Sequence, residues 1–191
     1  MKKTKIYFSI AFLLIIFDQL TKIVVKGFNL FGFTHKGFYL GESIPVIGET
    51  ITFTFVENPG AAFGLEFGAA KIFLSLFSVF AGAGLGWYLW KLEGYNKFVR
   101  IGIMFIFSGA VGNMIDRVFY GVIYSESSLF YGKVVDFIRV DIPNIEFLNM
   151  THWPVFNIAD FCVSSGVIIL LFVHDKLPSI AKIRGIEKSE D

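Results

Sequence analysis

Hydrophobic residues run along this chain in four long stretches that are separated by more polar segments. Each stretch reaches about 20 residues, the length that an α-helix needs to cross a bilayer. The stretches cover residues 6–25, 69–90, 99–120 and 155–173. A shorter segment at 50–56 alternates polar and apolar residues, which is the period of a half-buried strand. The pattern predicts an all-α integral membrane protein, one domain over residues 1–191, with four transmembrane helices and a small extracytoplasmic β-sheet element.

Basic residues predict the orientation of these helices. Lysine and arginine gather before the first helix, between the second and third, and after the fourth, and cytoplasmic flanks carry such an excess. They are Lys2, Lys3, Lys5, Lys91, Lys97, Arg100, Lys176, Lys182, Arg184 and Lys188. We therefore expect a multi-pass protein with both termini in the cytoplasm. The longer segments at about 26–68 and 121–154 are then extracytoplasmic.

Composition agrees with a membrane protein and narrows the possible functions. Charged residues make up 17% of the chain, against about 25% in soluble domains. The net charge of +1 gives no reason to expect a nucleic-acid partner. The single cysteine excludes an internal disulfide framework. The three histidines are scattered, so we expect no metal site.

Charged and amide side chains interrupt the hydrophobic stretches at matching depths. A charge inside hydrocarbon is costly, so such a group marks a functional site by default. With the predicted topology, the polar groups of three helices lie in the outer third of the membrane, and two more arrive there from the extracytoplasmic segments. They are Asp18, Lys22, Asn113, Asp116, Arg117, Asn157 and Asp160 from the helices, with Asn58 and Asp136 from the segments.

Structural pairing alone explains part of this cluster. Asp18 and Lys22 are four residues apart and so share one helix face, where they can pair. Asp116 can pair with Arg117 or with a neighbouring helix. The two membrane asparagines can simply hydrogen-bond across helices.

Pairing explains Asp136 and Asp160 less well, because few cations remain near them. Two carboxyl groups without cations can share one proton, since like charges a few ångströms apart cannot both ionise cheaply. One carboxyl group then acts as a general base on water, while the other protonates the substrate carbonyl. These two residues therefore predict aspartic-protease chemistry.

Five short motifs resemble, in order, those of one known family, the bacterial lipoprotein signal peptidases (signal peptidase II). The motifs are Asp18–Lys22, Glu57–Gly64, Gly109–Arg117, Val134–Phe137 and Phe156–Asp160. In the second motif, Pro59 and Gly60 fit a tight turn in which the glycine takes a positive φ. The resemblance covers nearly the whole chain.

The resemblance implies an aspartic endopeptidase of the bacterial inner membrane with its active site towards the outer face. It would remove the signal peptide from diacylglyceryl-modified prolipoproteins, cutting just before the lipidated cysteine, and would need no metal or cofactor. We expect a monomer that contacts this substrate and membrane lipid. In this family resemblance, Asp136 and Asp160 are the catalytic residues. The residues that support the dyad and the substrate are Asn58, Gly60, Asn113, Arg117 and Asn157. The residues with a structural role are Asp18, Lys22 and Asp116.

The alternative interpretation is a small proton- or ion-coupled transporter in which Asp18, Asp116 and Asp160 form a relay. Four helices are few for a transporter, and the chain shows no inverted repeat of the kind that many transporters carry. The segment at 121–151 also looks long for the family. Its sequence leaves open whether it closes over the site or forms a solvated loop.

Overall fold

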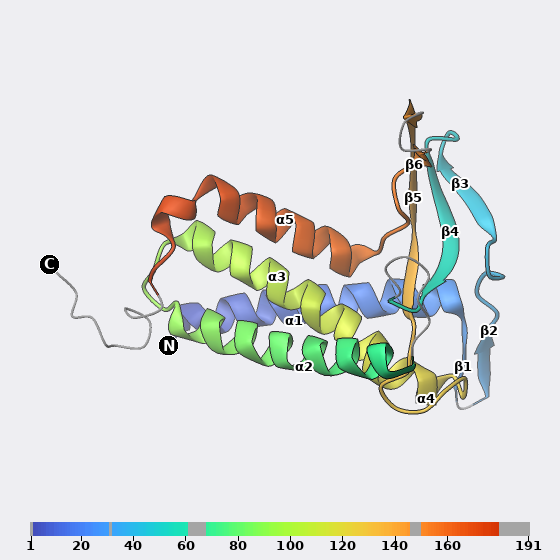
Figure 1. The fold of residues 1–191 in the computed structure, drawn as a ribbon, viewed down its shortest axis with the longest axis horizontal. Helices are drawn as coiled ribbons and strands as arrows, with labels where there is room; N and C mark the ends of the chain where they lie inside the picture. Colours follow the sequence, from blue (N-terminus) through green and yellow to red (C-terminus); the bar gives the residue numbers. More distant parts are fainter. Residues whose placement is uncertain (1, 31, 61–67, 146–149, 180–191) are drawn as a thin grey trace, which may run out of the picture.

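Four long helices run side by side, and a sheet stands across one end of them (Figure 1). The structure, a computed structural model, describes residues 2–30, 32–60, 68–145 and 150–179. The helices are α1 (Lys2–Lys26), α2 (Gly68–Lys91), α3 (Lys97–Ile115) and α5 (Ile158–Phe172). Each predicted hydrophobic stretch thus forms a helix. Within the described ranges, three spans are long and apolar enough to cross a membrane, and α5 is a shorter apolar helix.

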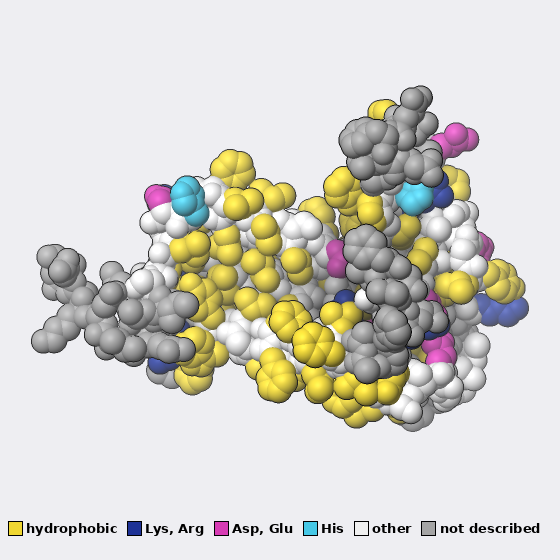
Figure 2. All heavy atoms as spheres, in the orientation of Figure 1, with side chains coloured by type: hydrophobic (Ala, Val, Ile, Leu, Met, Phe, Trp, Pro, Cys, Tyr) yellow, Lys and Arg dark blue, Asp and Glu magenta, His cyan; other side chains and the backbone are white. Residues whose placement is uncertain are grey.

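The helices carry large apolar side chains on the outside and polar ones on the inside. Phe12 of α1 is 62% exposed and Phe80 of α2 is 72% exposed, whereas Lys22 is completely buried. Hydrophobic side chains cover the visible face of the helical part of the molecule (Figure 2). Because lipid rather than water favours such a surface, this distribution fits helices that lie in a bilayer.

Glycines bring α3 close to its neighbours. A Cβ atom at Gly109 would lie 2.1 Å from the carbonyl oxygen of Ala159 in α5, and one at Gly112 would lie 2.7 Å from Oδ2 of Asp18 in α1. Small residues at these positions allow membrane helices to approach closely. They hold α1 and α5 against the face of α3 that carries the polar residues.

The part of the chain outside the helices contains more β-structure than predicted. An antiparallel sheet has the order β3–β4–β5–β6, and a separate hairpin joins β1 to β2. The strands are β1 (Phe28–Leu30), β2 (Phe33–His35), β3 (Ser43–Ile47), β4 (Ile51–Asn58), β5 (Val134–Ile145) and β6 (Met150–His152). The strand predicted at 50–56 is confirmed as β4. Apolar helices with small sheets agree with the predicted fold class, although the sequence reasoning assigned no strand to the segment that forms β5.

A second hydrophobic core joins the sheet to the helix ends. It consists of Val25, Phe55, Tyr120, Val135 and Phe137, which come from α1, β4, the π-helix that follows α3, and β5. This core fixes the sheet at the level where the helices carry their polar residues. The amino-terminal end of α1 and the carboxyl-terminal end of α5 lie at the opposite end of the bundle (Figure 1).

The third helix does not continue regularly to residue 120. A π-helix at Asp116–Tyr120 follows α3, and the short α4 (Gly121–Ile123) comes after it. Such wide turns are rare and often occur at functional sites, because they turn side chains out of their regular positions.

The long segment after α4 packs back onto the π-helix. The backbone N–H of Phe130 donates to the carbonyl oxygen of Val118 at 3.0 Å, and that of Gly132 donates to Arg117 at 3.0 Å. A Cβ atom at Gly132 would lie 2.1 Å from the carbonyl oxygen of Asp116, so a glycine is needed there. The segment therefore forms a packed connection that leads into β5.

Two sequence observations lie partly outside the described residues. They concern residues 61–64 of the second motif and the basic residues Lys182, Arg184 and Lys188 near the carboxyl terminus.

Candidate active site

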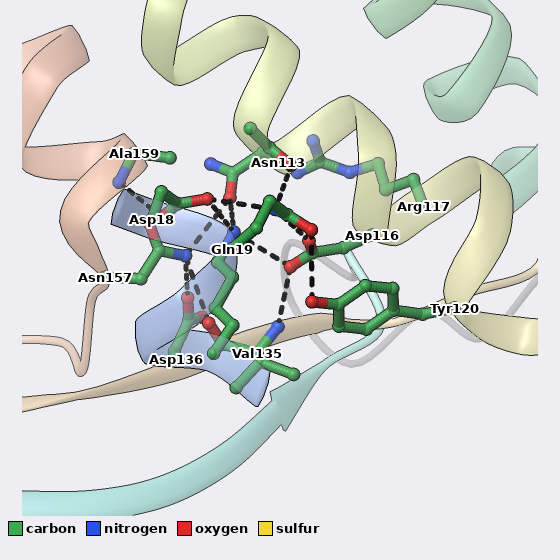
Figure 3. Close-up of polar contacts among 12 residues, drawn as sticks. Asp18, Gln19, Asn113, Asp116, Arg117, Tyr120, Val135, Asp136, Asn157 and Ala159 are labelled. Atoms are coloured by element: carbon green, nitrogen blue, oxygen red, sulfur yellow. Dashed lines mark hydrogen bonds and ion pairs between the residues drawn. The ribbon is translucent and has the colours of Figure 1, made fainter. Parts of the chain in front are cut away.

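The predicted site residues lie where the sheet joins the helix ends, and Figure 3 shows the polar contacts among part of them. They come from two strands, three helices and the π-helix. The contributions are Asp18 and Lys22 from α1, Asn113 from α3, Asp116 and Arg117 from the π-helix, Asn58 from β4, Asp136 from β5, and Asn157 and Asp160 from the start of α5.

Lys22 is the centre of this cluster. Its ammonium nitrogen lies 2.9 Å from Oδ2 of Asp18 and 2.8 Å from Oδ2 of Asp116. It also donates to Oδ1 of Asn113 at 2.9 Å. An ammonium group has three protons, so each proton has an acceptor. The predicted pairing of Asp18 with Lys22 is confirmed, and the partner of Asp116 is on the neighbouring helix.

The two carboxylates that pair with Lys22 also hold the backbone of the site. Oδ1 of Asp18 accepts a hydrogen bond from the N–H of Ala159 at 2.8 Å, and Oδ2 of Asp116 accepts one from the N–H of Val135 at 3.1 Å. Ala159 and Val135 each directly precede one member of the predicted dyad. The buried ion pairs therefore position the backbone next to both of those residues.

Gln19 and Tyr120 complete the buried network, and the sequence reasoning gave them no role. Nε2 of Gln19 lies 3.1 Å from Oδ2 of Asp18 and 3.0 Å from Oδ1 of Asp116. The Tyr120 hydroxyl donates to Oε1 of Gln19 at 3.1 Å. The position of Gln19 directly after Asp18 could have indicated that Gln19 belongs to the polar network. The sequence contains no such indication for Tyr120, because its contact with Gln19 depends on the π-helix.

Asp160 is fixed by the start of α5. Oδ1 of Asn157 accepts from the N–H of Asp160 at 2.9 Å, and Oδ2 of Asp160 accepts from the N–H of Asn157 at 3.2 Å. This reciprocal capping starts the helix at Ile158 rather than at the predicted residue 155. It also places the Asp160 carboxylate in the first helical turn, where the helix dipole stabilises negative charge.

Asp136 is fixed by two asparagines. Nδ2 of Asn58 donates to its Oδ2 at 3.1 Å, and Nδ2 of Asn157 donates to its Oδ1 at 2.6 Å. The register of β4 against β5 shifts between Phe53 and Val56, beside Asp136. Such a bulge redirects side chains out of the regular alternation of a strand.

Gly60 holds the amide of Asn58 in place. Its backbone N–H donates to Oδ1 of Asn58 at 2.9 Å, so the Nδ2 group of the same amide points at Asp136. The φ of Gly60 is +78°, as the predicted tight turn requires. A residue with a side chain is strained in this conformation.

The two asparagines on the helices connect the members of the predicted dyad. Nδ2 of Asn113 donates to Oδ1 of Asp160 at 2.7 Å, while Oδ1 of Asn113 accepts from Nδ2 of Asn157 at 3.1 Å. The predicted hydrogen bond between helices is thus present, and it is part of the site. Among the described residues, neither Asp136 nor Asp160 forms an ion pair.

Asp136 is held in an environment that favours its neutral form. Burial, and then the charge of Asp160, raise the pKa of the Asp136 carboxyl group to about 7, although hydrogen bonds from Asn58 and Asn157 oppose this shift. A carboxyl group with this pKa can hold a proton near neutral pH, as the proton donor of an acid–base pair requires.

Arg117 keeps donors free for another partner. Its Nη1 lies 3.4 Å from Oγ of Ser78, and within the part of the chain that the structure describes its buried Nε has no hydrogen-bond partner. Of the two partners predicted for Asp116, Arg117 or a neighbouring helix, the structure shows the second, because Asp116 pairs with Lys22 of α1. Unsatisfied guanidinium donors next to two carboxyl groups could bind a carbonyl oxygen of a bound molecule.

A second ion-pair cluster fixes the end of β4 just before Asn58. Glu57 pairs with Lys26 of α1 and with Lys133 at 2.7 Å, and Lys26 also pairs with Glu126 at 2.7 Å. Burial alone would raise the pKa of Glu57, but hydrogen bonds from Lys133 and Lys26 hold it below its usual value. The sequence reasoning did not find this cluster, because its members lie far apart along the chain.

We expect Lys22→Met to destabilise the protein strongly, because it leaves two carboxylates buried without a cation. Breaking a buried ion pair in this way costs about 3–5 kcal/mol. In a protein of this size that corresponds to a fall in the midpoint of thermal unfolding of about 6–20 °C. The measurement is thermal unfolding of the purified protein in detergent. Lys36→Met is the matched control, since Lys36 is exposed, and an equal midpoint for both variants would contradict the structural role of Lys22.

Known proteins resemble this chain over most of its length. The sequence profile of the family described as signal peptidase (SPase) II matches residues 10–174. A lipoprotein signal peptidase of Pelodictyon phaeoclathratiforme is 35% identical over 175 residues, which cover 91% of this chain and 92% of that protein. One from Porphyromonas gingivalis is 33% identical over 205 residues, covering 92% of this chain and 85% of the relative.

A solved structure agrees with these sequence matches. A bacterial membrane enzyme, described as solved by the in meso method, superimposes with a TM-score of 0.69. It is 30% identical in sequence, and the match covers 91% of this chain and 95% of that one. The chain therefore belongs to the signal peptidase II family of membrane aspartic peptidases.

Proposed function

We propose that this enzyme removes the signal peptide from diacylglyceryl-modified prolipoproteins and cuts just before the lipidated cysteine. The relatives named lipoprotein signal peptidase support this substrate class. The observation that carries the proposal is the environment of Asp136 and Asp160. Both carboxyl groups are held by asparagine amides and by no cation among the described residues. This arrangement suits two carboxyl groups that share one proton.

In the proposed reaction, the ionised carboxylate removes a proton from a water molecule, and the water oxygen attacks the scissile carbonyl carbon. The protonated carboxyl group of the pair gives its proton to the carbonyl oxygen, so the intermediate carries no full negative charge. When the intermediate collapses, the C–N bond breaks and the leaving nitrogen takes up a proton from the dyad. One hydroxyl group of the intermediate returns its proton to the dyad as the C=O bond reforms, so the pair again holds one proton. Arg117 and Asn58 are placed to bind the substrate backbone, and no metal or cofactor takes part in these steps.

The observed contacts do not support the proton relay that the transporter alternative requires. Two of its three acidic groups, Asp18 and Asp116, are bound to Lys22 and to backbone N–H groups. A proton relay needs groups that exchange protons with one another, whereas these two act as fixed anchors.

We also propose a single-domain, monomeric enzyme in the bacterial inner membrane, with four spans, both termini in the cytoplasm and the site towards the outer face. The distribution of basic residues supports this orientation. The 15 residues of α5 measure about 22 Å, less than the hydrocarbon core of about 30 Å. Because its cap, Asn157, lies at the depth of the site, the non-helical residues 153–157 before it would complete the crossing.

The orientation can be tested with introduced cysteines. In a Cys162→Ala background, we expect Lys36→Cys to react with a membrane-impermeant maleimide in intact cells, and Lys91→Cys to react only after the cells are opened. Both lysines are exposed, and they lie at opposite ends of the bundle. Labelling of Lys91→Cys in intact cells, with protection of Lys36→Cys, would reverse the proposed topology.

The dyad can be tested with a synthetic diacylglyceryl-modified peptide and the purified enzyme in detergent. We expect Asp136→Asn and Asp160→Asn each to lower kcat by at least about a hundredfold, since each removes a proton-transferring group. Asp141→Asn, a partly exposed position on the same strand, is the control and should retain activity. Substantial cleavage by either dyad variant, with a wild-type unfolding profile, would contradict the assignment.

The dependence of kcat/KM on pH tests the protonation of the pair. We expect kcat/KM to fall as pH rises through about 7, because Asp136 then loses the proton that its raised pKa retains. Asn58→Ala removes a hydrogen bond that lowers this pKa, so the falling limb should move to higher pH. The apparent pKa read from this falling limb belongs to the pair of carboxyl groups and not to one residue. A limb that Asn58→Ala leaves in place, or moves to lower pH, would disprove this explanation.

A further inference from the structure

A cavity of about 520 Å³ opens beside Asp160, between α5 and the sheet. Apart from Asp160, its walls come from β5, the segment before α5, and the first turns of α5. They include Val140, Ile142, Trp153, Val155, Phe161 and Ser164. Figure 2 shows a notch between the end of α5 and the sheet, with hydrophobic side chains beside it and an acidic side chain at its inner end.

The cavity can hold an apolar chain better than a peptide. The backbone of its sheet-side wall is already engaged: the N–H of Trp153 donates to Val140 at 2.8 Å, and Phe156 exchanges hydrogen bonds with Ile138 at 3.0 and 2.7 Å. An extended peptide placed there would find few partners for its own N–H and C=O groups, and unpaired groups are costly in an apolar site. A hydrocarbon chain needs no such partners.

The cavity is also accessible from the membrane. Trp153 is 57% exposed and Phe161 is 57% exposed, and both lie at its rim. Trp153 suits the interface between hydrocarbon and headgroups. Ser164 follows Asp160 by one helical turn and leaves a gap on the surface of α5, because its side chain is small. A chain that starts near Asp160 can therefore run along α5 towards the membrane interior.

We infer that this cavity binds an acyl chain of the substrate's diacylglyceryl group. The inference rests on the proposed function, in which the lipid is attached to the residue directly after the scissile bond. Its glyceryl group must then lie close to the dyad when the bond is cut. The cavity is lined by Asp160 and by the exposed residues Phe161 and Ser164 of α5. It holds the acyl chain beside the reacting carbonyl without removing the chain from the membrane.

The test compares two peptides that differ only in their acyl chains, one dipalmitoylglyceryl and one dihexanoylglyceryl, with purified full-length enzyme in detergent. We expect Ser164→Trp to lower kcat/KM for the dipalmitoyl peptide about tenfold more than for the dihexanoyl peptide, a typical size for steric discrimination in an apolar pocket. Ser164→Leu should give a smaller change in the same direction. If the Ser164→Trp variant does not fold, the Ser164→Leu variant still tests the inference. The wild-type enzyme and each variant are measured in the same micelles. Any difference in how the two peptides partition into the micelles is therefore the same for both enzymes and does not change the comparison.

Ser9→Trp is the matched control, because Ser9 is an exposed serine on α1 that does not line the cavity. It should leave the ratio of the two kcat/KM values as in the wild type. An equal loss for both peptides in the Ser164 variants would assign the cavity to the peptide and overturn the inference. No loss for either peptide would show that the cavity is not used, and would overturn it too. Failure of the wild-type enzyme to cut either peptide would overturn the proposed function itself, and this assignment with it.

Discussion

The buried ammonium group of Lys22 is the interaction on which the rest of the site depends. It is completely inaccessible to solvent and bonds to Asp18, Asp116 and Asn113. One lysine and two aspartates leave a net negative charge, which the amide of Gln19 and two backbone N–H groups help to balance. Removing one member would leave an uncompensated charge in a medium that solvates charges poorly, and this costs far more than the intact group contributes to stability. All members of the cluster are therefore needed together. Their contacts connect α1, α3, α5 and β5.

This arrangement keeps the positive charge close to the proposed dyad, Asp136 and Asp160, but not in contact with it. A lysine bonded directly to Asp136 or Asp160 would favour the ionised form of that carboxyl group and so oppose the sharing of a proton. Instead, Lys22 bonds to the oxygen of the Asn113 amide, and the nitrogen of that amide donates to Asp160. Asn58 and Asn157 act on Asp136 in the same way. Amides orient carboxyl groups without adding a full charge, so the pair is fixed in position while its protonation stays free to change.

The sequence predicted the helices well, because long hydrophobic stretches have few other structures available in a membrane. It also predicted the meeting of Asp18, Asn113 and Asp160, because helix direction and rise place them at one depth. The strand β5 was not predicted: Val134, Val135, Asp136 and Phe137 are all buried, so the alternation that usually reveals a strand is absent. The partner of Asp116 and the contact of Tyr120 with Gln19 depend on how α1 packs against a π-helix. No local pattern in the sequence contains that information.

Asn157 and Asp160 determine both where the site lies along the helices and where α5 begins. The two residues cap the helix through each other, so the helix begins with Asp160 in its first turn, and Asp18 holds that turn through Ala159. A helix that started at residue 155 would carry Asp160 away from Asn113 and out of reach of the amide of Asn157. The shortness of α5 is therefore a consequence of building the site at the end of the helix. The residues before it also become free to pair with β5, which places the sheet beside Asp136 and Asp160 and leaves the apolar cavity between α5 and the sheet.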